Sequence, residues 1–324
     1  MKIVFFGTPN YVVPVLEALH KAFKNRGGSP IAAVVTQEPK LSGREQQKTF
    51  SPVDAWAYQH KKPIYFNPMD IVTENIDAEI AVLASFGKII PDEVIKYFKY
   101  GIINIHPSLL PQWRGASPIQ ATIVSGQKET GVTFMKLDPL LDHGEIISQF
   151  KDEVFDTDNN ESLRTRLFER ASNVLVDLIP AYTSGKIKTK PQEHDKATFT
   201  KQLKKEDGFI PPKYLEAELS GKTRRDKWEI SWMKVDNKPY YSQPTVYNVF
   251  SFIRAMEPWP GAWTSVKVGN DTSQAKRLKI LKAHLSNLQT TTNGPQLMLD
   301  EVQLEGKSPV SWRQFTEGYP NAKF

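Results

Sequence analysis

The chain has 324 residues, of which 40% are hydrophobic and 24% are charged, values that are ordinary for a folded protein with a sizeable core. Its length favours two domains, and the absence of cysteine excludes disulfides, thiolate nucleophiles and cysteine-based metal sites. The formal net charge of +6 divides into +1 over residues 1–190 and +5 over residues 191–324. The basic C-terminal half fits either a polyanion-binding surface or a merely solubilising one.

Short apolar runs alternate with amphipathic segments in the N-terminal half. Strands are predicted at residues 2–6, 31–36, 80–85, 102–106, 132–137 and 146–150, with helices among them at 13–23, 53–60, 118–125 and 163–178. This alternation predicts an α/β fold with a doubly wound, mostly parallel sheet. The dinucleotide-binding fingerprint is missing, because Pro9 and Val12 stand where glycines would follow Gly7. A nicotinamide or flavin site is therefore disfavoured.

Residues 37–50 form a polar stretch with few apolar side chains, and they include Lys40, Arg44 and Lys48. The pattern predicts a long mobile loop. Loops of this length inside a compact domain are usually functional or disordered.

Residues 101–115 read GIINIHPSLLPQWRG and combine a β-branched strand with two polar side chains. Asn104 and His106 are two positions apart, so a strand directs both to the same face. Pro107 ends the strand and Pro111 stiffens the loop, which places both polar groups where open α/β sheets bind ligands. Taken alone, the pair is also explained by a turn-forming asparagine and a hydrogen-bonded structural histidine.

A second polar loop, residues 138–145, lies between two predicted strands and contains Asp142. Asn104 and a protonated His106 can donate hydrogen bonds to a developing oxyanion. Asp142 can raise the basicity of His106 and accept, directly or through water, the proton of an attacking amine. These three residues suffice for acyl-type transfer to an amine, and no metal is needed. His143, next to Asp142, is a second imidazole that can compete for the role of His106.

The C-terminal part of the chain has a different pattern. Residues 184–200 are polar and predict a linker between a domain of residues 1–183 and a domain of residues 201–324. A short helix is predicted at 246–255, followed by short strands at 262–268, 277–283 and 296–304. Short strands with turns between them predict a small β-barrel, a class that often binds nucleic acids. Residues 207–243 mix prolines, lysines and aromatic residues and give no clear assignment.

Six stretches spread over both predicted domains carry a recognisable pattern. They are FFGTP at 5–9, ASFGKIIP at 84–91, NIHPSLLPQWRGASPIQ at 104–120, ETGVTFMKLDPLLDHGE at 129–145, MEPWPGAW at 256–263 and KSPVSWRQFTEGY at 307–319. Together they resemble the folate-dependent formyltransferases. Asn104, His106 and Asp142 match the catalytic residues of that family. The C-terminal motifs are similar to the OB-like, tRNA-binding barrel of the branch that acts on methionyl-tRNA.

The resemblance implies a formyl donor and an amine acceptor. The α-amine of initiator methionyl-tRNA would attack the formyl carbon of 10-formyltetrahydrofolate beside Asp142. Arg44 matches a Gly-Arg in the family's tRNA-contacting insertion, with Lys40 and Lys48 on either side as further tRNA ligands. The resemblance places the folate near Phe86, Gly87, Ile89, Ser108, Leu109, Leu110 and Pro111.

Two other functions stay open. One is formyl transfer to a different amine, such as a sugar nucleotide or a purine-pathway amine, and the other is a non-catalytic nucleic-acid-binding module of the same fold. The basic second domain favours a polyanionic substrate. The presence of Asn104, His106 and Asp142 together argues against a module without catalytic activity.

Hydropathy and composition bear on membrane contact and on the cell compartment. The first apolar run is far too short for the core of a signal peptide, and no stretch reaches membrane-spanning length. We therefore expect no membrane contact. The absence of cysteine fits a reducing cytosol, so we expect a cytoplasmic protein, and we expect it to be a monomer.

Overall fold

The computed structural model describes residues 1–24, 28–42, 47–222, 224–268, 275–286 and 294–324. These residues form two compact units. Unit 1 consists of Met1–Arg114, Glu129–Glu153 and Arg164–Ala197, and unit 2 consists of Gly115–Lys128, Val154–Leu163 and Thr198–Phe324. Two short segments of the N-terminal half thus group with the C-terminal unit. The division into residues 1–183, 184–200 and 201–324 stays a prediction about functional domains.

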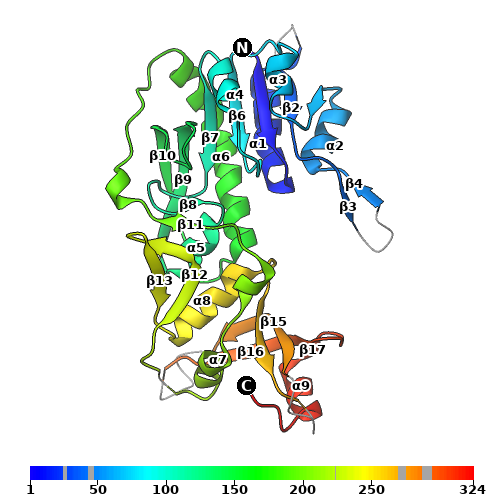
Figure 1. Ribbon diagram of the computed structural model, residues 1–324, viewed down its shortest axis with the longest axis vertical. Helices are drawn as coiled ribbons and strands as arrows, with labels where there is room; N and C mark the ends of the chain where they lie inside the picture. The colour runs from blue at the N-terminus through cyan, green and yellow to red at the C-terminus, as the bar shows by residue number, and fades with distance from the viewer. Residues whose placement is uncertain (25–27, 43–46, 223, 269–274, 287–293) are drawn as a thin grey trace. The chain divides into compact units, whose positions relative to one another are not determined.

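Unit 1 is built on a seven-stranded sheet. Its strands are β1 (Ile3–Gly7), β2 (Ile31–Val35), β5 (Ile64–Tyr65), β6 (Ile80–Ala84), β7 (Ile102–His106), β9 (Glu129–Lys136) and β10 (Ile146–Glu153). They lie in the order β10-β9-β7-β6-β1-β2-β5 (Figure 1). Five neighbouring strands of this order are parallel, namely β7, β6, β1, β2 and β5. Strand β9 runs antiparallel to β7, and β10 runs antiparallel to β9. The mostly parallel α/β sheet that the sequence predicts is confirmed.

Unit 1 also contains helices. They are η1 (Asn10–Val12), α1 (Val13–Ala22), α2 (Pro52–Gln59), α3 (Asp70–Thr73), α4 (Asp92–Tyr97), η2 (His194–Lys196) and most of α6 (Asn160–Thr183). Every residue of β1 is buried, as expected for a parallel strand covered on both faces. One apolar cluster joins the sheet to α3 and α4, and it includes Ile102 of β7. Since alternate residues share a face, Asn104 and His106 lie on the same side of β7 as Ile102.

A two-stranded antiparallel sheet lies within residues 37–50. Its strands are β3 (Lys40–Ser42) and β4 (Gln47–Thr49), with Lys40 opposite Thr49 and Leu41 opposite Lys48. The expectation of a loop without strands was wrong at these positions. Strands made of polar residues lack the apolar periodicity on which the prediction depends, and they form here through backbone pairing. Arg44 lies outside the described residues.

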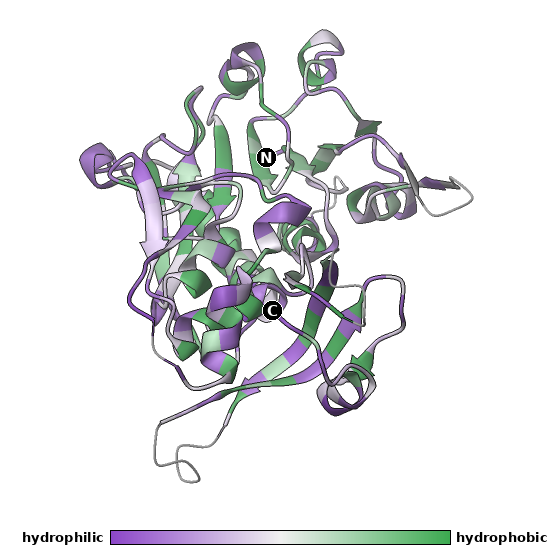
Figure 2. Ribbon diagram, turned by 60° about the horizontal axis from the view of Figure 1, so that its bottom comes forward, coloured by the Kyte–Doolittle hydropathy of each residue, from purple (hydrophilic) through white to green (hydrophobic). Residues whose placement is uncertain are grey.

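Unit 2 contains two four-stranded sheets. The first has the order β13-β12-β11-β8 and consists of β8 (Arg114–Gly115), β11 (Phe199–Thr200), β12 (Trp228–Val235) and β13 (Lys238–Ser242). Arg114, the first residue of β8, is grouped with unit 1. The second, in the order β14-β15-β16-β17, is antiparallel and consists of β14 (Ala262–Val266), β15 (Lys276–Leu285), β16 (Leu297–Leu304) and β17 (Val310–Ser311). Buried and more exposed residues alternate along most of the long strands β15 and β16, as expected for a sheet with one buried face, and both strands carry hydrophobic and hydrophilic residues (Figure 2).

The helices of unit 2 are α5 (Pro118–Val124), η3 (Lys205–Gly208), α7 (Pro212–Leu219), α8 (Val246–Met256) and α9 (Trp312–Gly318). Residues 207–243, which the sequence left unassigned, contain α7, β12 and β13. The short strands predicted near the C-terminus are confirmed as β14, β15 and β16, and they form an antiparallel sheet. In the described part of the chain β14 and β17 are its two edges, so no closed barrel is seen there.

Helix length and hydropathy also bear on membrane contact. Along the described residues, every helix is either too short or too polar to cross a lipid bilayer.

Candidate active site

The three polar side chains that the sequence singles out lie together in unit 1. The loop between β9 and β10 brings Asp142 to the face of β7 that carries Asn104 and His106. Asn104 Nδ2 donates a hydrogen bond to Asp142 Oδ1 at 3.3 Å, and Asp142 Oδ2 lies 3.7 Å from His106 Nδ1. Asn104 and His106 are buried, and 13% of the Asp142 side chain is exposed. An amide, an imidazole and a carboxylate are therefore in mutual reach and largely shielded from water.

The other ring nitrogen of His106, Nε2, has a hydrogen-bond partner in the main chain. Nε2 lies 3.0 Å from the carbonyl oxygen of Trp113. A carbonyl oxygen only accepts hydrogen bonds, so Nε2 carries a proton. Nδ1, which faces Asp142, is then the nitrogen that has the lone pair in the neutral ring.

A hydrogen-bond network around Thr133 holds the loop that follows β7. The Thr133 hydroxyl donates to the carbonyl of Ser108 at 2.7 Å and accepts from the Leu110 N–H at 3.0 Å. Gln149 Nε2 donates to the same hydroxyl and to the carbonyl of Leu110, at 2.8 and 2.9 Å. The side chains of Ser108 and Leu110 are buried, whereas Leu109 and Pro111 are partly exposed.

The loop that follows β6 presents both core and surface residues. Phe86 is buried, and its carbonyl oxygen accepts a hydrogen bond from Gln37 Nε2 at 2.9 Å. Gly87 has φ +77°, a left-handed backbone conformation that favours glycine. Ile89 is 92% exposed. Leu137, at the start of the Asp142 loop, packs against the apolar cluster that contains Phe86, which connects the two loops.

Two buried residues that sequence reasoning missed hold the Asp142 loop. Gln192 Nε2 donates to the carbonyl oxygens of Asp142 and Gly144, at 3.0 and 2.7 Å. Arg114 donates from Nε and Nη2 to Gln192 Oε1, at 3.2 and 2.7 Å. Burial lowers the pKa of Arg114, and the nearby carboxylates of Asp142 and Asp138 act in the opposite direction. The only sequence signal was for Arg114, which falls within the stretch of residues 104–120.

His143 has partners other than Asn104 and Asp142. Its Nδ1 lies 2.7 Å from Asp138 Oδ2, and its ring is stacked on that of His194 with centroids 3.9 Å apart and 2° between the planes. His194 belongs to residues 184–200, for which the sequence predicted a linker. In the structure this segment is tied to unit 1 at several points, including the pairing of Lys190 with Ile146, and its role as a linker stays a prediction.

The side chains expected to contact tRNA are separate from these residues. Lys40 and Lys48 are exposed on the two paired strands β3 and β4. Within the part of the chain that the structure describes, no group of His, Asp and Glu side chains is placed to share a metal ion.

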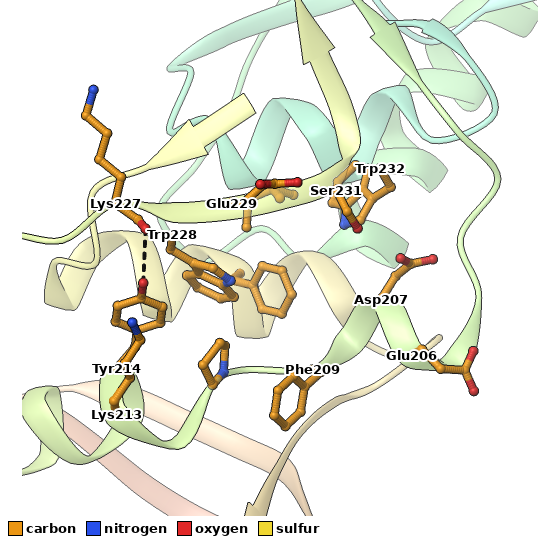
Figure 3. Close-up of a pocket in the computed structure, with 13 residues that line it drawn as sticks. Glu206, Asp207, Phe209, Lys213, Tyr214, Lys227, Trp228, Glu229, Ser231 and Trp232 are labelled. Atoms are coloured by element: carbon orange, nitrogen blue, oxygen red, sulfur yellow. Dashed lines mark hydrogen bonds between the residues drawn. The ribbon is translucent and has the colours of Figure 1, made fainter. Parts of the chain in front are cut away.

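A pocket of about 490 Å³ lies in unit 2, and none of the residues that line it belongs to the site around Asp142. Figure 3 shows its aromatic side chains and the hydrogen bond from the Tyr214 hydroxyl to the carbonyl of Lys227, at 3.0 Å. Trp228, Trp232 and Phe252 also line it, and all three are buried. Most of its aromatic surface is therefore part of the core of unit 2.

Two family models match the chain. The model described as formyl transferase matches residues 1–179, and the model described as formyl transferase, C-terminal domain, matches residues 241–320. A methionyl-tRNA formyltransferase from Halalkalibacterium halodurans is 32% identical over 336 residues, which cover 98% of this chain and 95% of that protein. One from Geotalea uraniireducens is 30% identical over 334 residues, with the same two coverages of 98% and 95%.

Solved structures share the fold. A methionyl-tRNA formyltransferase from Clostridium thermocellum superposes with a TM-score of 0.55 at 20% identity, covering 94% of this chain and 98% of that chain. An N-formyltransferase from Helicobacter canadensis, in complex with folinic acid and dTDP-3-aminofucose, superposes with a TM-score of 0.62 at 15% identity, covering 92% and 98%. At these identities the likeness concerns the fold alone.

Proposed function

Because the chain belongs to the formyl transferase family, we propose that it transfers a formyl group from 10-formyltetrahydrofolate to the α-amino group of initiator methionyl-tRNA, for translation initiation. The observation that carries the proposal is the contact of Asp142 with both Asn104 and His106 on one face of β7. The choice of acceptor is supported by relatives named methionyl-tRNA formyltransferase, which match almost the whole chain.

The residues around Asp142 fit a formylated folate in their donor chemistry. A formyl oxygen needs hydrogen-bond donors, and Asn104 has a second amide N–H besides the one that meets Asp142. A flat ring system needs apolar surface, which the exposed Ile89 and Leu141 provide. When bound, the folate supplies an activated formyl group. We assign its binding to Phe86, Gly87, Ile89, Ser108, Leu109, Leu110 and Pro111.

Each of the three central residues then has a defined role. Asn104 donates its free N–H to the formyl oxygen as negative charge develops there. His106, protonated at Nδ1, donates a second hydrogen bond to the same oxygen. Asp142 stabilises that protonated ring and accepts the proton that the attacking amine loses, directly or through one water. The same proton would pass to the folate nitrogen as its bond to the formyl carbon breaks, so the step balances with no other reagent. The His106 assignment is supported by its 3.7 Å approach to Asp142, since the Nδ1 of His143 is engaged by Asp138.

The acceptor is a polyanion in this proposal, and the charge distribution supports it. Residues 191–324 carry a net charge of +5, which favours contact with phosphates. The OB-like barrel remains a prediction for the antiparallel C-terminal sheet. A cytoplasmic monomer remains a prediction as well.

The function is tested by incubating the full chain with 10-formyltetrahydrofolate and one of two acceptors, methionyl-tRNA or a dTDP-amino sugar. We expect formylmethionyl-tRNA as the product, measured by mass spectrometry after deacylation. Formylation of the amino sugar alone would replace the proposed acceptor with a sugar nucleotide. Formylation of neither acceptor would overturn the proposal.

Removing the charges of Lys40 and Lys48 together is expected to weaken tRNA binding and leave folate binding unchanged. Both side chains are exposed on the β3–β4 pair. Each phosphate contact contributes roughly 0.7–0.9 to the slope of log affinity against log salt concentration, so the double alanine variant should lose up to about 1.8 of that slope. The measurement is filter binding of methionyl-tRNA over a range of salt concentrations.

The matched control for this double variant is Lys186→Ala, which removes another exposed lysine of unit 1. Its salt slope is expected to equal that of the wild type. An unchanged slope in the Lys40 and Lys48 double variant would show that these lysines do not contact phosphates.

A further inference from the structure

Hydrogen bonds fix the protonation of the two stacked imidazoles beside Asp142. His143 Nδ1 lies 2.7 Å from Asp138 Oδ2, and a carboxylate oxygen only accepts, so this nitrogen carries a proton. Arg114 Nη2 lies 2.8 Å from His194 Nδ1, and a guanidinium only donates, so this nitrogen has a free lone pair. His194 is therefore neutral, with its proton on Nε2.

The surroundings of His194 favour the neutral form. Loss of hydration lowers its pKa, and the His143 ring and the Arg114 guanidinium lower it further, whereas Asp138 and Asp195 act in the opposite direction. Because the pKa is lowered in the folded chain, this arrangement is intact above the ordinary histidine pKa of about 6.5 and is lost as the pH falls through the folded value. Protonation would place a second N–H against Arg114 and break their hydrogen bond.

Hydrogen bonds connect the stack of His143 on His194 to the loop that positions Asp142. His143 stands between Asp142 and Gly144, whose carbonyl oxygens are both held by Gln192. Arg114 donates to Gln192 and to His194, and only 4% of it is exposed. The buried guanidinium of Arg114 therefore holds the Asp142 loop at two points. It holds the main chain of the loop through Gln192, and it holds the His143 side chain through His194.

We propose that His143 is a positioning residue, whose stack on neutral His194 keeps the Asp142 carboxylate against Asn104 and His106, and that proton uptake by the stack releases this hold. The charged and titratable groups that act on the two rings are Asp138, Arg114 and Asp195, and the two imidazoles also act on each other. The inference deepens the proposed function, and its kinetic test rests on that function.

The kinetic test compares two substitutions of His143 in the full chain. His143→Ala removes the stack, and its kcat for methionyl-tRNA is expected to fall about tenfold at pH 7.5, with the KM of both substrates within about twofold, because a displaced catalytic carboxylate slows the chemical step. His143→Phe keeps a flat ring on His194 and is expected to recover most of the lost kcat. A His143→Ala variant with wild-type kcat, or a His143→Phe variant as slow as His143→Ala, would overturn the proposal.

The pH dependence separates positioning from a general loss of stability. His194→Phe keeps the stacked ring but cannot take up a proton, so its kcat is expected to fall less between pH 7 and pH 5.5 than that of the wild type. His60→Ala is the matched control, because His60 is another stacked imidazole of unit 1, 4.0 Å from the Trp56 ring. Its pH profile should match the wild type. A His194→Phe profile identical to that of the wild type would contradict the proposed release by protonation.

A readout without substrate keeps this inference distinct from the proposed function. Nitrogen-15 NMR of the full chain, with the two rings assigned from the phenylalanine variants, is expected to show the Nδ1–H form of His143 and the Nε2–H form of His194 at pH 7. A protonated His194 at pH 7 would overturn the inference even if methionyl-tRNA is formylated. The expected tautomers in a chain that formylates no acceptor would support the stack and reject the function.

Discussion

The Asn104→Ala variant is expected to formylate methionyl-tRNA about 10²-fold to 10³-fold more slowly than the wild type. Alanine removes the amide that contacts Asp142 at 3.3 Å, and with it the N–H assigned to the formyl oxygen. The backbone pairing of residue 104 with Leu83 and Met135 does not depend on the side chain, so the sheet should remain. Because the lost interaction forms as charge develops, kcat and kcat/KM should fall by similar factors.

The control for this substitution is Asn173→Ala, on the exposed face of α6. Both variants are compared with the wild type by steady-state formylation, and their folding is compared by circular dichroism and thermal unfolding. We expect the Asn173→Ala variant to retain its activity. A folded Asn104→Ala variant with nearly wild-type kcat would show that this amide does not stabilise the reacting oxygen.

Strand periodicity is what made half of the site predictable. The residues of β7 are β-branched on either side of Asn104, and a strand places Asn104 and His106 on one face whatever covers it. The approach of Asp142 has no local signal, because it depends on a loop that folds back over the sheet. The candidate role of Asp142 therefore came from the chemistry of a carboxylate near an imidazole and from the family resemblance.

The residues that were missed are those whose role depends on tertiary contacts. Gln192 lies in a polar stretch typical of a linker, yet it is 5% exposed and holds two carbonyl oxygens of the Asp142 loop. No composition rule distinguishes a buried glutamine from a solvated one. In β12 a signal was present, since Trp228, Ile230 and Trp232 alternate with polar residues and are all buried. The prolines and lysines around that strand obscured it.

The Asp142→Asn variant is expected to lose about 10²-fold to 10⁴-fold in the rate of formyl transfer, the range that a positioned general base contributes. Asparagine has nearly the same shape, and its oxygen can still accept the hydrogen bond from Asn104 Nδ2. It carries no charge, however, so it neither stabilises a protonated His106 across 3.7 Å nor accepts the proton of the amine. Folate affinity, measured by fluorescence titration, should stay within about twofold of the wild type.

The control is Asp177→Asn, which removes an exposed carboxylate of α6 and should leave the rate unchanged. Single-turnover formylation of methionyl-tRNA separates the chemical step from product release. Asp142 contacts Asn104 directly, so the two residues should act as a unit, and the double variant should lose less than the product of the two single losses. If the two losses multiplied fully, Asn104 and Asp142 would act on the reaction independently, and the shared site proposed here would be wrong.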